Sequence, residues 1–241
     1  MSLAGKHVLI TGGARRIGKA LALGIARAGG IVSIHFGHAL VEGKKLLDEI
    51  HQQGHEAHLI QADLSDLGQI AGIVRKACEQ DPLFALVNNA AIFEQLTWEN
   101  TDLESWQRHL NINLTAPFFL SQAFARLIPP GEPGRIVNIL DWRALRPGPD
   151  HLPYTISKAG LAALTQSLAA ALAPDIQVNG IALGAILPPS DGNDSSNILQ
   201  NLPAQRWSTL NEVVDLLLFL LDGPAYITGE IIHLDGGRHL V

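Results

Sequence analysis

Cysteine is nearly absent from the sequence, because Cys78 is the only one among 241 residues. No disulfide can therefore form within the chain, which suits the reducing cytoplasm, where we expect the protein to reside. Apolar runs long enough to span a bilayer are missing, and no charged amino-terminal segment followed by an apolar stretch marks a signal peptide. We therefore expect no membrane partner.

Net positive charge is also absent. Lysine and arginine number 17 against 23 aspartate and glutamate residues, which gives a formal net charge of −6. An acidic chain repels the polyanionic backbone of DNA and RNA, so we expect no nucleic-acid partner. Repeats of solenoid length and low-complexity tracts are missing too. What remains is an ordinary globular composition, 47% apolar, which fits one domain over residues 1–241.

Apolar, β-branched segments alternate with helical patterns along the whole chain. This alternation predicts an α/β fold: a single-domain, Rossmann-type, doubly wound parallel sheet of about seven strands with helices on both faces. Residues 187–206 lack periodicity, so we expect a substrate loop there, although a variable surface loop would have the same composition. The expected strands are 6–11, 31–36, 57–63, 84–87, 135–140, 176–183 and 229–234, and the expected helices are 19–30, 39–53, 66–80, 103–127, 154–172 and 211–221.

A glycine-rich turn joins the first expected strand to the first expected helix. Strand, glycine turn and helix are the context of a dinucleotide-binding site, although the spacing differs from the usual G-x-G-x-x-G. Glycines let the backbone approach a pyrophosphate, and the N–H groups at the helix start attract it. We expect cofactor contacts from Gly12, Arg15, Arg16, Ile17 and Gly18.

The end of the second expected strand lacks the acidic residue that would bind the ribose 2′-hydroxyl of NAD. His35, Phe36 and His38 stand there instead, and we expect them near the cofactor. Arg15 and Arg16 add positive charge that favours a 2′-phosphate, although each could be a solvated surface charge. The predicted cofactor is therefore NADPH (NADP).

Polar and small residues follow other expected strands at their carboxyl ends, the edge where open α/β sheets bind ligands. Asp63 and Leu64 end the third strand, where an adenine ring could sit. Two asparagines and two alanines end the fourth strand, and a small-residue segment ends the sixth. The additional expected cofactor contacts are Asp63, Leu64, Asn89, Ala90, Ala91, Gly184 and Ile186.

Tyr154 stands four residues before Lys158 at the start of an expected helix, so both side chains lie on one helix face. A free phenol has a pKa of about 10 and is a poor proton shuttle at neutral pH. We expect Lys158 to lower the pKa of Tyr154, so that the pair can move a proton beside a carbonyl or imine during hydride transfer. The Y-x-x-x-K pattern alone is common, and a half-buried tyrosine with a solvated lysine would have the same spacing.

Asp141 directly follows the apolar strand that precedes Tyr154, and it is either a site residue or a cap of the following loop. Asn113 lies in an apolar stretch of the 103–127 helix, so we expect it to be buried and hydrogen-bonded. Pro117 should kink this helix or be absorbed near its start.

Three histidines, His51, His55 and His58, have a spacing that resembles metal ligands. Gly54 interrupts the helix between them, and no cluster of carboxylates or cysteines joins them in the sequence. We interpret them as loop and surface residues, and no metal site is predicted.

In this order and spacing, the motifs resemble the short-chain dehydrogenases/reductases over essentially the full length. The resemblance implies an enzyme that moves a hydride between NADPH and a small-molecule substrate. It also implies that Tyr154 delivers the proton, that Lys158 binds the nicotinamide ribose, and that Asn113 holds a water that relays protons. The matching pieces are Thr11-Gly12 to Gly18, Asp63-Leu64, Asn88-Asn89-Ala90, Asn113, Tyr154 with Lys158, residues 178–186, Ile227 to Glu230, and Leu234 to Gly237.

Two departures from the family pattern indicate a subgroup. Most members carry Gly at the position of Arg16 and a catalytic Ser at the position of Asp141. Together with Phe93 after the Asn-Asn-Ala motif, these residues resemble pteridine reductases and dihydromonapterin-type reductases. That resemblance implies that Phe93 stacks the pterin against the nicotinamide, and that Asp141, Tyr154 and Lys158 deliver the proton. The expected catalytic residues are Asp141, Tyr154, Lys158 and Asn113, and the expected substrate contacts are Arg16, Phe93, Asp141, Tyr154 and Leu187. Tyr154 and Lys158 are also expected to contact the cofactor.

The Asp at position 141 has a chemical consequence. In a ketone reductase, Ser and Tyr donate hydrogen bonds to an oxygen on which negative charge develops, and an ionised Asp would repel that charge. Asp141 suits a substrate that presents N–H donors, or one that accepts a bond from a carboxyl kept protonated by burial. The residue therefore favours a nitrogen heterocycle such as dihydropterin, biopterin or dihydrofolate. Against this reading, Ala91 stands where pteridine reductases usually carry a polar Ser.

Two other functions are compatible with the sequence. One is a general carbonyl reductase of the 3-oxoacyl-thioester type, and Asp141 is the feature against it. The other is a catalytically silent NADP(H)-binding sensor, which would not need Tyr154, Lys158 and Asn113.

Two of the expected helices carry apolar residues that one sheet does not need for its core. Family members commonly pair such helices between subunits, so we expect a homodimer or homotetramer. These residues could instead pack on their own sheet. They are Phe118, Phe119, Phe124 and Leu127 on one helix, and Leu161, Leu164, Leu168 and Leu172 on the other.

Overall fold

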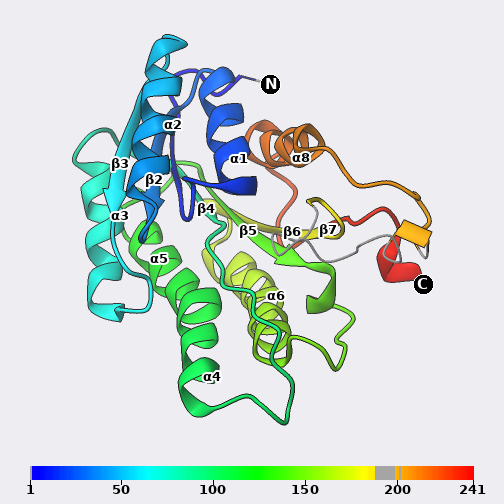
Figure 1. The fold of residues 1–241 in the computed structure, drawn as a ribbon. Helices are drawn as coiled ribbons and strands as arrows, with labels where there is room; N and C mark the ends of the chain where they lie inside the picture. The colour runs from blue at the N-terminus through cyan, green and yellow to red at the C-terminus, as the bar shows by residue number, and fades with distance from the viewer. Residues whose placement is uncertain (1, 188–198, 201) are drawn as a thin grey trace.

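The computed structural model describes residues 2–187, 199–200 and 202–241, and in this part of the chain seven strands form one parallel sheet (Figure 1). The strand order is β3-β2-β1-β4-β5-β6-β7, so the predicted doubly wound fold is confirmed. The strands are β1 His7–Ile10, β2 Ile31–Phe36, β3 Ala57–Gln61, β4 Leu83–Asn88, β5 Gly134–Asp141, β6 Ile176–Leu183 and β7 Ile231–Leu234.

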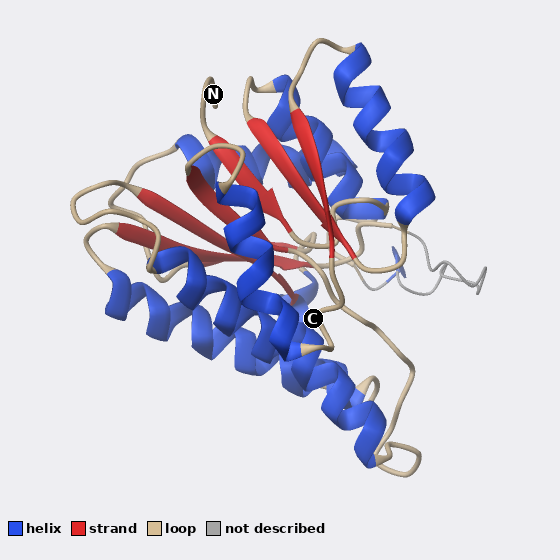
Figure 2. Ribbon diagram, turned by 90° about the vertical axis from the view of Figure 1, so that its left-hand side faces the viewer, coloured by secondary structure: helices blue, strands red, loops and turns tan. Residues whose placement is uncertain are grey.

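Helices cover both faces of the sheet (Figure 2). The central strands, such as β1 and β6, are buried on both faces, which is why they are apolar at successive positions rather than at alternate ones. Val8 and Ile10 pack with the helices of one face, and Leu9 between them packs with those of the other. The first face carries α1 Arg16–Arg27, α2 Leu40–Gln52 and α8 Leu210–Asp222, and the second carries α3 Ile70–Cys78, α5 Ala116–Ala125 and α6 Leu152–Leu172.

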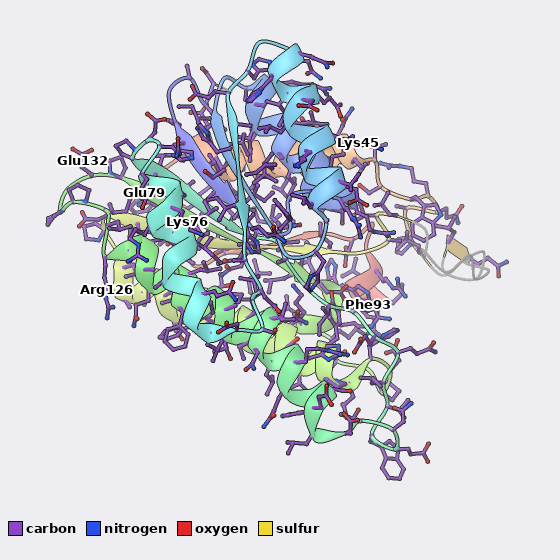
Figure 3. All side chains as sticks on the ribbon, turned by 60° about the vertical axis from the view of Figure 1, so that its left-hand side comes forward. Lys45, Lys76, Glu79, Phe93, Arg126 and Glu132 are labelled. Carbon is purple, nitrogen blue, oxygen red and sulfur yellow. The ribbon has the colours of Figure 1, made fainter. Side chains whose placement is uncertain are left out.

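The order of the strands reverses at β1, which pairs with β2 on one side and with β4 on the other. Open α/β sheets bind ligands in the crevice beyond the carboxyl ends of the strands at such a switch point. Figure 3 shows Phe93, which follows β4, on the opposite side of the molecule from Glu79 and Glu132, which precede β4 and β5. Phe93, one of the expected substrate contacts, therefore lies at the edge formed by the carboxyl ends of the strands.

The helix predicted over 103–127 is present from Leu103 to Ala125, but it is not α-helical throughout. The structure has α4 Leu103–Leu110, a π-helical turn at Asn111–Thr115, and then α5. Pro117 explains the interruption, because it has no N–H and its ring clashes with a carbonyl one turn earlier. The widened turn lets the N–H of Ala116 reach the carbonyl of Asn111, five residues back, and Pro117 is absorbed in the first turn of α5.

Several other boundaries differ from the prediction by one to four residues, and three of them have a visible local feature. A 3-10 turn, Leu67–Gln69, replaces the start of the expected 66–80 helix, and the side chain of Asp66 accepts the N–H of Gly68 there. Strand β7 begins after Gly229, whose φ of +80° is outside the extended region. Helix α6 begins at Leu152, with Pro153 in its first turn, a position where proline is favourable.

The apolar faces of α5 and α6, which were expected to pair between subunits, are partly buried within this chain. Phe124 and Leu161 are buried in the core of this chain, whereas Phe119 is 40% exposed and Leu127 is 49% exposed. The helices in the described part of the chain include none that is long and apolar enough to cross a membrane. Of the predicted substrate loop, residues 188–198 and 201 lie outside the described residues.

Candidate active site

The glycine turn packs directly against the end of β4. Gly12 has a φ of +62°, and a Cβ on it would lie 2.9 Å from Cα of Ala90. A Cβ on Gly18 would overlap the carbonyl oxygen of Gly12 and lie 2.7 Å from Nδ2 of Asn89. Both positions therefore require glycine for close approach of the backbone.

Neutral hydrogen bonds fix this turn in place. Thr11 Oγ1 accepts the backbone N–H groups of Asn89 and Ala90, each at 3.0 Å. In return, Asn89 Nδ2 donates to the carbonyl oxygens of Thr11 at 2.8 Å and Gly12 at 3.1 Å. The start of α1, with its outward N–H groups, is thereby held beside the end of β4, as a pyrophosphate site requires.

The two arginines of the turn behave differently. Arg15 is exposed and forms an ion pair with Glu42 on α2. Arg16 has a φ of +49°, which is a left-handed conformation. This conformation explains why glycine is usual at this position in the family that the sequence resembles. A non-glycine residue there costs on the order of 1 kcal/mol, and such strain is concentrated at functional sites. Arg16 lines the cavity described below, together with Asp141 and Tyr154.

His35 lies beneath the glycine turn. Its side chain is 2% exposed; Nδ1 accepts the N–H of Gly12 at 3.4 Å, and Nε2 donates to the carbonyl of Ala62 at 3.1 Å. Burial lowers the pKa of His35 to about 4, so the ring is neutral at pH 7. Phe36 is also buried, and of the three expected residues only His38 is exposed.

Asp63 and Leu64, which were expected beside an adenine ring, lie at the start of a turn after β3. The carboxylate of Asp63 accepts the N–H of Ser65 at 2.8 Å, and this bond lowers the pKa of Asp63. The side chain of Leu64 is buried in the core between the sheet and α3. Leu64 is therefore a packing residue of the core.

Tyr154 and Asp141 meet at the end of β5. The hydroxyl of Tyr154 donates to Oδ2 of Asp141 at 3.2 Å, and the backbone N–H of Arg143 donates to Oδ1 at 2.9 Å. Lys158 is buried on the same face of α6, and its Nζ donates to the carbonyl of Ile139 at 2.7 Å. Nζ lies 5.8 Å from the centre of the Tyr154 ring. Asp141, Tyr154 and Lys158 thus form one cluster.

The expectation that Lys158 lowers the pKa of Tyr154 is wrong for this geometry. Burial, followed by the charge of Asp141 and the hydrogen bond to it, raises the pKa of Tyr154 well above its usual value. Lys158 is directed towards Ile139 instead, and burial lowers its own pKa to about 8. The phenol is therefore held in its protonated form, beside an acceptor.

Arg143 is a member of this cluster that the sequence did not reveal. Its Nη2 donates to Oδ2 of Asp150 at 2.7 Å, and its Nη1 lies 3.7 Å from Oδ1 of Asp141. Burial lowers the pKa of Arg143, but the two carboxylates outweigh this effect and raise it. A charged residue two positions after Asp141 was the only available signal, and it is typical of any surface loop.

Asn113 is a fully satisfied buried amide. Its Nδ2 donates to the carbonyl of Ile92 and to Oγ of Ser157, each at 3.0 Å, and its Oδ1 accepts the N–H of Ile92 at 2.9 Å. Both amide hydrogens are therefore used within the protein. The contact links the π-helical turn to the segment that carries Phe93.

Phe93 is 54% exposed beside this cluster. Its ring stacks on His151, with centroids 4.0 Å apart and planes at 18°, and meets the ring of Tyr154 edge-on at 4.7 Å. His151 has a left-handed φ of +51° just before α6 and was also missed from the sequence. An aromatic surface thus adjoins the hydroxyl of Tyr154.

A cavity of about 200 Å³ brings together residues from both halves of the sheet. It lies between the glycine turn and the Asp141–Tyr154 cluster. His35, Phe36, His38, Asp63, Leu64 and Phe93 are not in its lining. The expected site residues that do line it are Arg16, Ile17, Asn89, Ala91, Asp141, Tyr154, Lys158, Gly184, Ile186 and Leu187.

The three histidines with metal-like spacing do not converge. His51 Nε2 lies 3.2 Å from the carbonyl of Ala57, whereas Nε2 of His58 lies 3.5 Å from the carboxylate of Glu56. Glu56, His58 and Asp81 have their potential ligand atoms within 4.8 Å of one another, at the amino ends of the strands and away from the cavity. This group is separate from the site described above.

Comparison with known proteins gives a consistent result. Residues 6–198 match the family model described as short chain dehydrogenase. A 3-oxoacyl-[acyl-carrier-protein] reductase from Synechocystis sp. is 31% identical, over 98% of each chain. The corresponding reductase from Aquifex aeolicus is 35% identical, again over 98% of each chain.

Among solved structures, FolM alternative dihydrofolate reductase 1 from Brucella canis, complexed with NADP, is similar with a TM-score of 0.94. It is 37% identical, and the match covers 99% of this chain and 96% of that one. The Brucella suis protein of the same name, also in complex with NADP, is 38% identical with a TM-score of 0.91, over 98% of this chain and 96% of that one.

Proposed function

The chain belongs to the short-chain dehydrogenases, and from this premise we propose that it is an NADPH-dependent reductase of a pteridine, such as a dihydropterin, dihydrobiopterin or dihydrofolate. The reaction is transfer of a hydride to a C=N or C=O bond. The single observation that carries the substrate class is Asp141, which stands at the usual serine position and accepts a hydrogen bond from Tyr154.

Support for NADPH comes from the residues around β1, where the order of the strands reverses. The end of β2 has no carboxylate to bind a ribose 2′-hydroxyl, and Arg15 lies exposed at the start of α1. The glycine positions fit a dinucleotide, because a Cβ at either one would collide with the neighbouring backbone or with Asn89. The NADP in both Brucella structures supports the same cofactor here. When bound, NADPH would supply the hydride.

The substrate argument rests on what Asp141 offers. Both of its oxygens accept hydrogen bonds, from the N–H of Arg143 and the hydroxyl of Tyr154. A ketone oxygen gains negative charge during reduction and needs donors, so an acceptor beside it is unfavourable. A pterin presents ring and amino N–H donors, which such an acceptor can bind. The exposed face of Phe93 offers a surface on which a flat ring can stack.

The proposed roles follow from these positions. Tyr154 delivers the proton, and its protonated form at neutral pH suits a donor. Asp141 orients Tyr154 and the substrate, Lys158 binds the nicotinamide ribose, and Asn113 supports the segment before Phe93. Arg16 would contact cofactor phosphate, substrate or both. Residues 187–206 would act as the substrate loop.

The test is NADPH oxidation with dihydrobiopterin and dihydrofolate, run beside an acetoacetyl thioester, with NADH as the cofactor control. Turnover of a pteridine with NADPH, and slower turnover with NADH, is the expected result. Turnover of the thioester alone would overturn the pteridine proposal. Asp141→Ser sharpens the assay: pteridine reduction should fall by about 10-fold or more, as when one positioned polar contact is lost, and ketone reduction should not fall with it.

The second candidate function is reduction of a 3-oxoacyl thioester, which the similarity to the Synechocystis and Aquifex reductases favours. Asp141 argues against it for the reason given above. A catalytically silent NADP(H) sensor is the third, and any turnover in the assay would exclude it.

We also propose that the protein acts in the cytoplasm as a homodimer or homotetramer. Phe119 and Leu127, which are exposed on α5 and just after it, support a contact between copies. Size-exclusion chromatography with light scattering tests it, and a monomer at micromolar concentration would contradict it.

A further inference from the structure

We propose that Arg143 is a positioning residue of this site, which holds one oxygen of Asp141 so that the other faces the hydroxyl of Tyr154. The inference rests on the proposed function only in so far as Asp141 and Tyr154 take part in the reaction. It adds a residue that no motif of the sequence marks.

The hold on Asp141 comes from both the backbone and the side chain of Arg143. A 3-10 turn, Trp142–Ala144, starts directly at the end of β5. It directs the N–H of Arg143 to Oδ1 of Asp141 at 2.9 Å, and Nη1 of the guanidinium lies 3.7 Å from the same oxygen. Oδ2 is left to accept the hydroxyl of Tyr154 at 3.2 Å. Arg143 thus holds Oδ1 of Asp141, and Oδ2 remains to accept the hydrogen bond from Tyr154.

Arg143 is itself firmly placed. Its side chain is only 13% exposed, and its guanidinium lies 4.9 Å from the centre of the Trp142 ring. Nη2 binds Asp150 at 2.7 Å, and Asp150 lies just before α6, whose first turn carries Tyr154. The guanidinium therefore connects the end of β5, which carries the acceptor, to the start of α6, which carries the donor.

The charges around Tyr154 support this role. Asp141 at the end of β5 opposes ionisation of the phenol, and Arg143 in the 3-10 turn favours it. Lys158 on α6 is bound to Ile139, and the neighbouring ring of Phe93 is uncharged. The guanidinium of Arg238, near the carboxyl terminus, lies 4.4 Å from the centre of the Trp142 ring. His151 is the residue directly before α6. Arg16, from the glycine turn, lines the same cavity as Asp141 and Tyr154. Arg143 is the cation that forms an ion pair with Asp141, at 3.7 Å.

The experiment is a double-mutant cycle between Arg143→Gln and Asp141→Ser, read as kcat and KM separately. Arg143→Gln should lower kcat/KM by about 10- to 100-fold, the usual effect of losing a residue that orients a site ligand. In the Asp141→Ser background the same substitution should change kcat/KM by less than about 3-fold, because a residue that acts through Asp141 is silent without it. Equal losses in both backgrounds, or no loss in the wild type, would overturn the proposal.

Two further variants control the cycle. Arg143→Lys keeps the charge but not the fork, so it should recover part of the activity lost in Arg143→Gln. If Arg143→Gln fails to fold, Arg143→Lys takes its place in the cycle and tests whether the guanidinium positions Asp141. Arg146→Gln is the matched control, because Arg146 is exposed in the same loop and its side chain contacts only the carbonyl of Arg238, at 3.5 Å, among the described residues. It should leave kcat/KM within about 2-fold, as expected for an exposed charge.

Failure of the proposed function would be recognised separately. The cycle uses whichever substrate the wild type reduces, so a thioester specificity would leave it intact. If the wild type reduces none, the same cycle is read as the denaturant concentration at the midpoint of unfolding. The loss caused by Arg143→Gln should then be smaller in the Asp141→Ser background than in the wild type, and equal losses would overturn the proposal.

Discussion

The two halves of the cavity are built in opposite ways. Apart from the exposed ion pair of Arg15 with Glu42, the glycine turn is held by neutral groups: Thr11, Asn89 and the uncharged ring of His35. The cluster at the end of β5 is held by charges, with Arg143 between two carboxylates. Changes to the turn should therefore act through shape, and changes to the cluster should act through charge and proton affinity.

The difference matches what each half has to do. A pyrophosphate site needs backbone close to the ligand, so side chains are excluded at Gly12 and Gly18. Proton delivery needs a donor whose affinity for its proton is set by its neighbours, so Asp141 and Arg143 surround Tyr154. Low dielectric strengthens both kinds of contact, but only the second depends on ionisation.

The largest effect is expected at the charged half. Tyr154→Phe removes the hydroxyl and little else, so turnover should fall by about 10²- to 10⁴-fold, as for loss of a general acid. NADPH affinity should stay within about 2-fold, because the glycine turn does not contact that hydroxyl. Steady-state rates and fluorescence titration with NADPH check both values. Activity that survives the substitution would show that another group delivers the proton.

A shape change should break the neutral half. In Gly18→Ala the added methyl overlaps the carbonyl of Gly12 and crowds Asn89, so the turn must move. We expect NADPH affinity to fall by about 10-fold or more and unfolding free energy to fall by about 1–3 kcal/mol, as for overpacking. Calorimetric titration and chemical denaturation measure these changes.

Gly72→Ala is the matched control for that substitution. A Cβ there would lie 3.9 Å from its nearest neighbour, Nη2 of Arg75, inside helix α3. Alanine at a helical position with free space should raise stability by about 0.5–1 kcal/mol. Equal losses in both variants would mean that crowding at Gly18 is not the cause.

The sequence predicted the parts of the molecule that depend on local pattern. Runs such as IVSIHF and the turn around Gly12 determine their own structure, and the parallel, doubly wound sheet follows from the β–α alternation. The spacing of Tyr154 and Lys158 placed both on one face of α6. The resemblance added Asp141 to the same cluster, and the structure brings it within hydrogen-bonding distance of Tyr154.

The rest depends on contacts between distant segments. Lys158 turns towards the carbonyl of Ile139 on β5, a partner that helical spacing cannot reveal. The π-helical turn arises from the conflict between Pro117 and a helix that continues on both sides of it. His35 was expected near the cofactor from its place at the end of a strand, but the sequence could not show that the glycine turn packs over it and buries it.

The smallest effect concerns His35, and it would sharpen the contrast between the halves. Its pKa is about 4 in the fold, against an ordinary value of 6.5. Above pH 6.5 the His35 ring is neutral in both the folded and the unfolded chain, so its protonation does not reduce the free energy of unfolding. As the pH falls, the unfolded chain binds the proton first, so unfolding free energy should decrease by about 2 kcal/mol between pH 7 and pH 5.

His35→Gln should remove this pH dependence while leaving the fold intact, because a glutamine amide can both accept from Gly12 and donate to Ala62 without titrating. Denaturant unfolding at pH 7 and pH 5 should therefore give a smaller difference for this variant than for the wild type. His38→Gln is the control, because His38 is exposed two residues further on. If both variants keep the wild-type difference, the ring of His35 is not the buried neutral support that distinguishes the glycine turn from the charged cluster.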